Sequence, residues 1–222
     1  TFDCQLNKLP SPQFQLRPSH QISSLDAQLS GSFEREKNKM ENEIPVTTTL
    51  SADEVVAIVD ENDNVVGSVT RAEMRSGKLR HRATYIFVKN SQDQYYVQKR
   101  TMLKDYCPGY YEACSGGVLQ ADETYEENAY RELEEEMGIK GIPLSHEFKF
   151  YYEDDGVKVF GDVWSGVYDG EVTLQEEEVE SVHMMTVEEI LEGTSSDLKF
   201  TPDSIIAIQK LAEKYAENNQ PK

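Results

Sequence analysis

The 222-residue chain is poor in cysteine, with only Cys4, Cys107 and Cys114. Their number is odd, and no two of them have the CxxC spacing of a zinc site or a redox pair. This usage argues against the disulfide framework that supports many small secreted domains. We expect all three residues to be reduced thiols.

Long apolar runs are also lacking, since no stretch reaches the roughly 18 apolar residues that a membrane-spanning helix needs. The first residues do not follow the order of a secretory signal, which is positively charged and then apolar. We therefore expect a soluble, cytoplasmic protein with no membrane partner.

Positive charge is scarce as well: 22 lysines and arginines stand against 41 aspartates and glutamates, which gives a formal net charge of -19. An acidic surface of this size repels nucleic acid and anionic membranes. A nucleic-acid partner is therefore disfavoured, and a small molecule is expected instead. The composition leaves a homodimer open.

Residues 1–45 are rich in Ser, Gln and Pro, and their apolar residues follow neither a helical nor a strand period. We expect a disordered extension here, followed by one domain over residues 50–218. Because the chain starts at Thr1, it is interpreted as a fragment, a processed product, or an extension ahead of a start at Met40. Organellar targeting is the weaker alternative, since this segment has only two arginines.

Regular patterns begin at Glu54, where β-branched runs alternate with polar turns. The first two pairs of strands read as hairpins, through Glu61–Asn64 and through Ser91–Asp93. The expected elements are strands at 54–60, 64–70, 83–90 and 94–100, a helix at 124–137, strands at 146–153, 157–168 and 178–185, and helices beginning at Thr186 and Thr201. Strands and helices without regular βαβ alternation indicate an α+β fold, with a mixed sheet between helices.

The most informative segment is GVLQADETYEENAYRELEEEMGI, residues 117–139. In a helix, Glu132, Glu135 and Glu136 stand at i, i+3 and i+4 and share one face. Three neighbouring carboxylates repel one another unless a cation lies between them, and Mg²⁺ prefers such oxygen ligands. The alternative is a solvated acidic helix face without a metal.

Two glycines precede this helix, at positions 116 and 117. Without side chains, their backbone can approach a metal ion or a phosphate closely. The carbonyl oxygen of Gly116 is therefore a candidate metal ligand alongside the three glutamates.

The spacing of the segment resembles the Nudix box, G-x5-E-x7-R-E-U-x-E-E-x-G-U, where U is aliphatic. The residues that match it, without a gap, are Gly117, Glu123, Arg131, Glu132, Leu133, Glu135, Glu136, Gly138 and Ile139. The resemblance implies the Nudix α/β/α sandwich over roughly residues 50–218, as the flanking strands and helices also fit it.

The resemblance also implies roles for these residues. In the family, glutamates at the positions of Glu132, Glu135 and Glu136 hold the metal ions, and one of them can act as base toward the attacking water. Arg131 and Glu123 look like the ion pair that fixes the loop onto the helix; a solvated surface pair is the alternative. The implied activity is Mg²⁺-dependent hydrolysis, with Mn²⁺ as a substitute, of the pyrophosphate bond of a small organic diphosphate.

Further candidates lie outside the box. The acidic run before the strand at 178–185 offers Glu178 or Glu177 as another metal carboxylate, although a solvated turn is the alternative. Arg80, Arg82 and Arg100 form a basic cluster in an acidic protein and are candidates to receive substrate phosphates. Charges that protect an edge strand are the alternative interpretation.

The segments LRHRATYIFV, PGYYEACSGGV and FTPDS resemble the Nudix subgroup closest to isopentenyl-diphosphate isomerases, which raises double-bond isomerisation as a rival activity. The rival needs a cysteine and a histidine where this chain has Gly116 and Val118, and Cys114 falls two residues short. His81 matches one isomerase metal histidine, but its partner position holds Met74. Hydrolysis is therefore favoured over isomerisation. A noncatalytic nucleotide-binding module is the remaining alternative, which the intact box disfavours. Nucleoside diphosphates and isoprenoid diphosphates both stay open as substrates.

Overall fold

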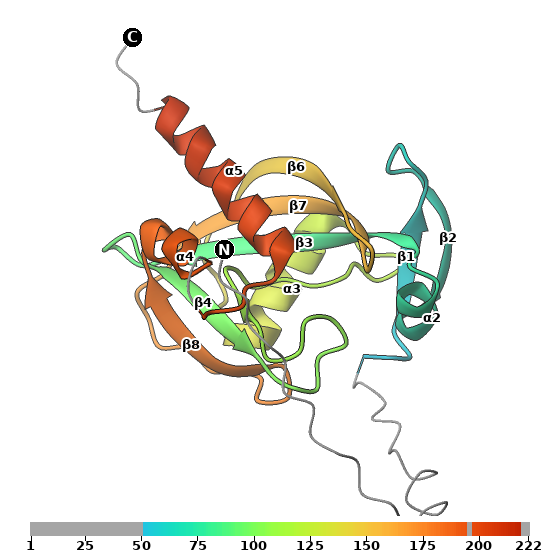
Figure 1. Cartoon of the computed structure of the whole chain (residues 1–222), viewed down its shortest axis with the longest axis horizontal. Coiled ribbons are helices and arrows are strands. Elements are labelled where there is room, and N and C mark those ends of the chain that lie inside the picture. Colours follow the sequence, from blue (N-terminus) through green and yellow to red (C-terminus); the bar gives the residue numbers. More distant parts are fainter. Residues whose placement is uncertain (1–50, 195–196, 219–222) are drawn as a thin grey trace, which may run out of the picture. The chain divides into compact units, whose positions relative to one another are not determined.

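An eight-stranded mixed sheet lies between helices in the computed structural model, which describes residues 51–194 and 197–218 (Figure 1). The extension expected over residues 1–45 falls outside the described residues. The strands are β1 (Val55–Val59), β2 (Val65–Thr70), β3 (Arg80–Lys89), β4 (Tyr95–Arg100), β5 (Tyr111–Glu112), β6 (Ser145–Glu153), β7 (Lys158–Val167) and β8 (Val179–Met185). The helices are α2 (Arg71–Ser76), α3 (Tyr125–Met137), α4 (Val187–Gly193) and α5 (Pro202–Asn218).

The first predicted hairpin is confirmed, since β1 and β2 pair antiparallel from Val55 and Thr70 to Val59 and Val65. Asp60 closes its turn by accepting hydrogen bonds from the backbone N–H groups of the loop, the behaviour expected of aspartate in such turns. Helix α2 follows directly and was not predicted. Its six residues are too few to show a periodic apolar face, although a capping box between Thr70 and Glu73 marks its start.

The second predicted hairpin is only partly correct, because β3 and β4 pair only next to the turn, at Lys89 and Tyr95. Beyond that point β3 pairs in parallel with β7, and β4 pairs antiparallel with β8. The segment after β5 forms bridges with β3, from Ser115 to Ile86 and from Val118 to Ala83. It thereby runs beside β3 and brings the glycines of the box into the middle of the sheet.

The alternating side chains of β3 divide the apolar core into two layers, as expected for a strand with both faces covered. Ile86 and Val88 pack with the inner face of α3, where Ala129, Leu133 and Met137 are buried as predicted. The other layer lies on the opposite face of β3. Tyr85 and Phe87 pack with Ile190 of α4 and with Ala207, Ile208 and Leu211 of α5. Helices α3 and α5 therefore cover opposite faces of the sheet (Figure 1), which is the expected α/β/α arrangement.

Helix α3 has well-defined ends. Thr124 and Glu127 form a capping box at its start, and Gly138 ends it with a φ of 66°, a left-handed conformation that suits glycine. Both limits agree with the sequence prediction. None of the helices in residues 51–194 and 197–218 is long and apolar enough to cross a membrane.

Candidate active site

Helix α3 directs two of its three candidate glutamates inward. Glu132 and Glu136 are buried, whereas the side chain of Glu135 is half exposed. Residues at i and i+4 lie almost above one another on a helix, and the residue at i+3 lies to one side. The shared face expected from the sequence is thus split into an inner pair and one outer carboxylate.

Two neutral donors bind one oxygen of the Glu136 carboxylate. Its Oε2 accepts hydrogen bonds from Nε2 of Gln98 at 3.0 Å and from the backbone N–H of Gly116 at 3.1 Å. Burial nevertheless raises the pKa of Glu136, and burial together with the charge of Glu136 raises the pKa of Glu132 well above its usual value. Two adjacent buried carboxylates of this kind are stabilised by any cation that lies near them.

The two glycines before the helix fit against these carboxylates because they have no side chains. A Cβ on Gly117 would lie 2.2 Å from Oε1 of Glu132, and a Cβ on Gly116 would lie 2.0 Å from the carbonyl oxygen of Thr84. Gly116 also has a φ of 152°, which L side chains rarely adopt. A side chain at position 116 would therefore collide with the backbone of β3, and one at position 117 would displace the carboxylate of Glu132.

Arg131 ties the preceding loop to α3. Its guanidinium contacts Glu123 twice, with Nε 2.7 Å from Oε1 and Nη2 3.0 Å from Oε2. It also lies 2.9 Å from Glu132 and 2.8 Å from Glu135. The structure thus brings together the pair implied by the resemblance, and the same arginine offsets part of the negative charge of the helix.

Glu178 lies in a segment that is joined to the end of α3, because the backbone N–H of Gln175 donates to the carbonyl oxygen of Glu136. Its Oε2 is 2.5 Å from Nζ of Lys104, which is also 3.5 Å from Oε1 of Glu136. Burial opposes ionisation of Glu178, but Lys104 holds the pKa of this carboxyl below its usual value. The alternative candidate, Glu177, is exposed.

Within the described residues, no three His, Cys, Asp or Glu side chains are placed so that they could share a metal ion. Two cationic side chains lie among the candidate carboxylates instead. Lys104 lies between Glu136 and Glu178, and Arg131 lies beside Glu132. The side chains are therefore arranged to neutralise one another.

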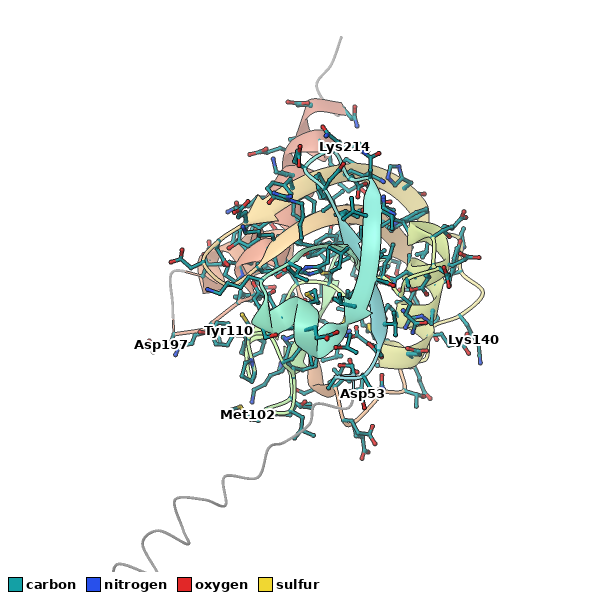
Figure 2. The ribbon with its side chains drawn as sticks, turned by 90° about the vertical axis from the view of Figure 1, so that its right-hand side faces the viewer. Asp53, Met102, Tyr110, Lys140, Asp197 and Lys214 are labelled. Atoms are coloured by element: carbon teal, nitrogen blue, oxygen red, sulfur yellow. The ribbon has the colours of Figure 1, made fainter. Side chains whose placement is uncertain are left out.

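Lys104 was missed by the sequence analysis. It belongs to the loop 101–110 between β4 and β5, in which Met102 points into solvent with 73% exposure (Figure 2). The side chain of Lys104 is instead buried against Glu136 and Glu178. Asp105 follows it and binds two arginines of α2, with its Oδ2 2.8 Å from Nε of Arg71 and 3.3 Å from Nε of Arg75. The loop is thereby fixed over the site.

A small pocket of about 40 Å³ lies beside the two glycines, and much of its lining is cationic. Arg71, Arg75, Arg100 and Lys104 all contribute to it. The two arginines of α2 were missed because that helix was not predicted. The signal was nevertheless present, as the capping box at Thr70 places both arginines one turn apart on the same helix face.

Only one of the three predicted phosphate-binding arginines lines this pocket. Arg100 does so, and it is paired there with Glu112 in a buried ion pair. Arg82 instead binds Asp63, with Nε 2.6 Å from Oδ1, and Arg80 donates to the hydroxyl of Tyr151. The expectation for Arg80 and Arg82 therefore does not fit the pocket, because their guanidinium groups bind Tyr151 and Asp63, which do not line it.

The residues considered for the isomerase are not assembled. His81 lines the pocket, but Cys114 is buried in the apolar core that contains α5 and is not part of the pocket lining. Burial also raises the pKa of the Cys114 thiol. Among residues 51–194 and 197–218, no cysteine lines this pocket.

The NUDIX domain family matches residues 79–204 of the chain, a range that includes the whole box. The chain belongs to the Nudix family. The Nudix hydrolase YfcD of Escherichia coli is 44% identical over 169 residues, which cover 76% of this chain and 92% of YfcD. A Nudix hydrolase of Pseudomonas aeruginosa is 39% identical over 156 residues, covering 70% of this chain and 92% of that protein. These relatives support pyrophosphohydrolase activity, and they leave the isomerase-like subgroup unassigned.

Solved structures agree with this fold. The protein DR0079 of Deinococcus radiodurans superposes with a TM-score of 0.64 at 24% identity, over 71% of this chain and 98% of that one. The NUDIX domain of Shewanella oneidensis NrtR, crystallised with ADP ribose, superposes with a TM-score of 0.52 at 14% identity, over 66% of this chain and 99% of that one. At these identities the likeness establishes the mixed sheet with flanking helices.

Proposed function

We propose that this Nudix protein hydrolyses the pyrophosphate bond of a small organic diphosphate with the help of a divalent cation, Mg²⁺ or Mn²⁺. One observation carries the proposal. The buried carboxylates of Glu132 and Glu136 contact the same two glycines that line a cationic pocket. Anion-binding side chains and cation-binding carboxylates therefore meet at one place.

The donor set suits a hard divalent cation, which prefers oxygen ligands. Glu132 and Glu136 would provide carboxylate oxygens and Gly116 its carbonyl oxygen. Glu178 and Glu135 would add further oxygens only after leaving Lys104 and Arg131, since no three of these side chains are placed to share an ion among the described residues. The raised pKa values of Glu132 and Glu136 support this assignment, because a cation relieves both their burial and their mutual repulsion. When bound, such an ion activates water and offsets charge on phosphate oxygens.

The pocket would hold the diphosphate. Arg71 and Arg75 both line the pocket while Asp105 fixes their orientation, and planar guanidinium groups suit phosphate oxygens. Lys104 adds a point charge that reaches both the pocket and the carboxylates. Arg71 and Arg75 lie outside the matched range 79–204, so this contribution comes from the preceding helix α2.

The reaction would be attack of water on one phosphorus atom. The new P–O bond forms as the bond to the bridging oxygen breaks, a carboxylate of the box takes the proton of the water, and the bridging oxygen leaves with the other fragment. The products are a phosphomonoester and a phosphate. The cationic side chains of the pocket would stabilise the charge that develops on the phosphate oxygens.

A phosphate-release screen of nucleoside and isoprenoid diphosphates, with Mg²⁺ or Mn²⁺, tests the proposal. We expect turnover of at least one diphosphate and its loss with EDTA. Protein carrying Glu136→Gln and purified in the same way controls for contaminating phosphatases. Absence of metal-dependent release throughout the panel would contradict the proposed function.

A further inference from the structure

A second group of polar side chains lines the same pocket and is not used by the diphosphate chemistry. Asp203, in the first turn of α5, is buried and lies in the lining together with Tyr85 and Tyr106. Its Oδ2 accepts a hydrogen bond from the hydroxyl of Tyr85 at 2.8 Å, and its Oδ1 accepts one from the hydroxyl of Tyr106 at 3.3 Å. A carboxylate with roughly four acceptor positions therefore retains capacity for further donors.

Asp203 differs from the other acidic residue of the lining. Glu112 is joined to Arg100 in a buried ion pair, whereas Asp203 forms no ion pair among the residues that the structure describes. The start of α5 stabilises its charge, because the N-terminus of a helix favours anions. This position and the two tyrosines explain how a carboxylate is kept in the pocket wall without a direct ion pair.

We infer that Asp203 selects among diphosphate substrates by accepting a hydrogen bond from a hydroxyl or amino group on the organic part of the substrate. The inference rests on the proposed function and narrows it. A substrate donor would use the remaining acceptor positions of Asp203. An apolar isoprenoid chain would instead cover this carboxylate and the tyrosine hydroxyls without replacing their contacts with water, which disfavours binding.

The competing location for an apolar chain is a separate groove of about 570 Å³, lined by aromatic and aliphatic side chains that include Tyr110, Tyr152, Phe200 and Ile205. No described residue lines both this groove and the polar pocket. A chain that extended into the groove would bypass Asp203. The two placements therefore predict opposite substrate preferences.

A minimal pair of substrates separates them: dimethylallyl diphosphate and its 4-hydroxy derivative, which differ by one hydroxyl group, with ADP as a larger donor-bearing substrate. We expect the unmodified full-length protein to have a kcat/KM at least tenfold higher for a donor-bearing diphosphate than for dimethylallyl diphosphate. Asp203→Asn, which keeps the size but loses the charge, should lower that kcat/KM at least tenfold. It should leave the value for dimethylallyl diphosphate unchanged or raise it.

Asp162→Asn is the matched control, since it makes the same change at a buried aspartate that does not line the pocket. It should preserve the ratio of kcat/KM between the substrates. An unmodified protein that prefers dimethylallyl diphosphate would overturn the inference even if Asp203→Asn fails to fold. An Asp203→Asn variant whose kcat/KM falls by the same factor for every substrate would overturn it as well. In both cases metal-dependent hydrolysis would still support the proposed function, whereas absence of hydrolysis of every diphosphate would overturn both.

Discussion

At the scale of single residues, the site is governed by how carboxylates and cations are paired. Glu136 is the most deeply buried of the box glutamates, with 1% exposure, and its contacts are Gln98, Gly116 and Lys104. Glu135 is exposed and bound by Arg131. The structure therefore ranks Glu136 above Glu135 as the glutamate on which activity depends.

Replacing Glu136 by Gln should lower kcat roughly a hundredfold or more, which corresponds to about 2.7 kcal/mol or more in the activation free energy. Glutamine keeps the size and one carbonyl oxygen but loses the charge that a divalent cation needs. The melting temperature should hold or rise, because the substitution removes a buried charge whose pKa is raised by burial. Steady-state kinetics with added metal and thermal unfolding measure the two effects.

Glu134→Gln is the control for this change. Glu134 lies on the same helix but is exposed and pairs with Lys140 at 3.0 Å, outside the site. The kcat of the Glu134→Gln variant should stay within a few fold of that of the unmodified protein, since exposed ion pairs contribute little to stability. Near-normal, metal-dependent turnover of the Glu136→Gln protein would show that the metal carboxylates lie elsewhere.

At the scale of elements, the site depends on a helix and two loop segments that are joined to one another by hydrogen bonds and ion pairs. Helix α3 begins in a capping box at Thr124, next to the loop that Glu123 and Arg131 hold. Segment 175–178 is joined to the end of α3, and Thr101 at the start of the loop 101–110 bonds to the same segment. The candidate ligands thus come from elements that constrain one another.

Thr124→Ala should lower the free energy of unfolding by about 1 kcal/mol, because it removes the acceptor for the backbone N–H of Glu127. It should also lower turnover, since the start of α3 adjoins the box loop. The matched control is Thr186→Ala, which removes the same type of cap from α4. Urea unfolding should show a similar loss of stability in Thr186→Ala, but its turnover should equal that of the unmodified protein. Equal turnover in the two variants would contradict the link between the cap of α3 and the site.

At the scale of the whole molecule, acid stability should depend on His81, which is 2% exposed. Burial, followed by the charge of Arg75, lowers its pKa from 6.5 to about 3. Below about pH 6.5 the unfolded chain binds a proton that the folded protein does not bind. The free energy of unfolding therefore falls as the pH decreases toward 3, by at most about 1.4 kcal/mol per pH unit from this group.

His81→Gln should make this decrease less steep. Urea unfolding between pH 7 and 5, above the isoelectric point of about 4.6, measures the slope. His183→Gln, at an exposed histidine, is the control and should retain the slope of the unmodified protein. An unchanged slope in His81→Gln would show that this histidine is not kept neutral by the fold.

A chain that starts at Met40 should keep the melting temperature and turnover of the full-length protein. The reason is that residues 1–45 show no periodic apolar face with which to pack on the domain. Comparison of thermal unfolding and kcat for the two chains tests this expectation. A large loss of either quantity in the shorter chain would assign the segment a structural role.

The sequence by itself determined the elements whose signals are local. The capping residues and Gly138 fixed both ends of α3, the β-branched runs and the Asp60 turn specified the first hairpin, and the spacing of the box indicated the family. Each of these signals lies within a few residues of the structure it specifies, because caps, turns and helix faces arise from neighbours along the chain.

Only the tertiary structure decided which distant residues meet. The parallel pairing of β3 with β7 and the insertion of the segment around Gly116 beside β3 join parts of the chain that no local period connects. The same is true of Arg71, Lys104 and Asp203, which come from a short helix, a loop and the last helix to line one pocket. Their convergence depends on how the elements pack around the core, and hydrophobic periodicity specifies the buried face of an element without specifying its partner.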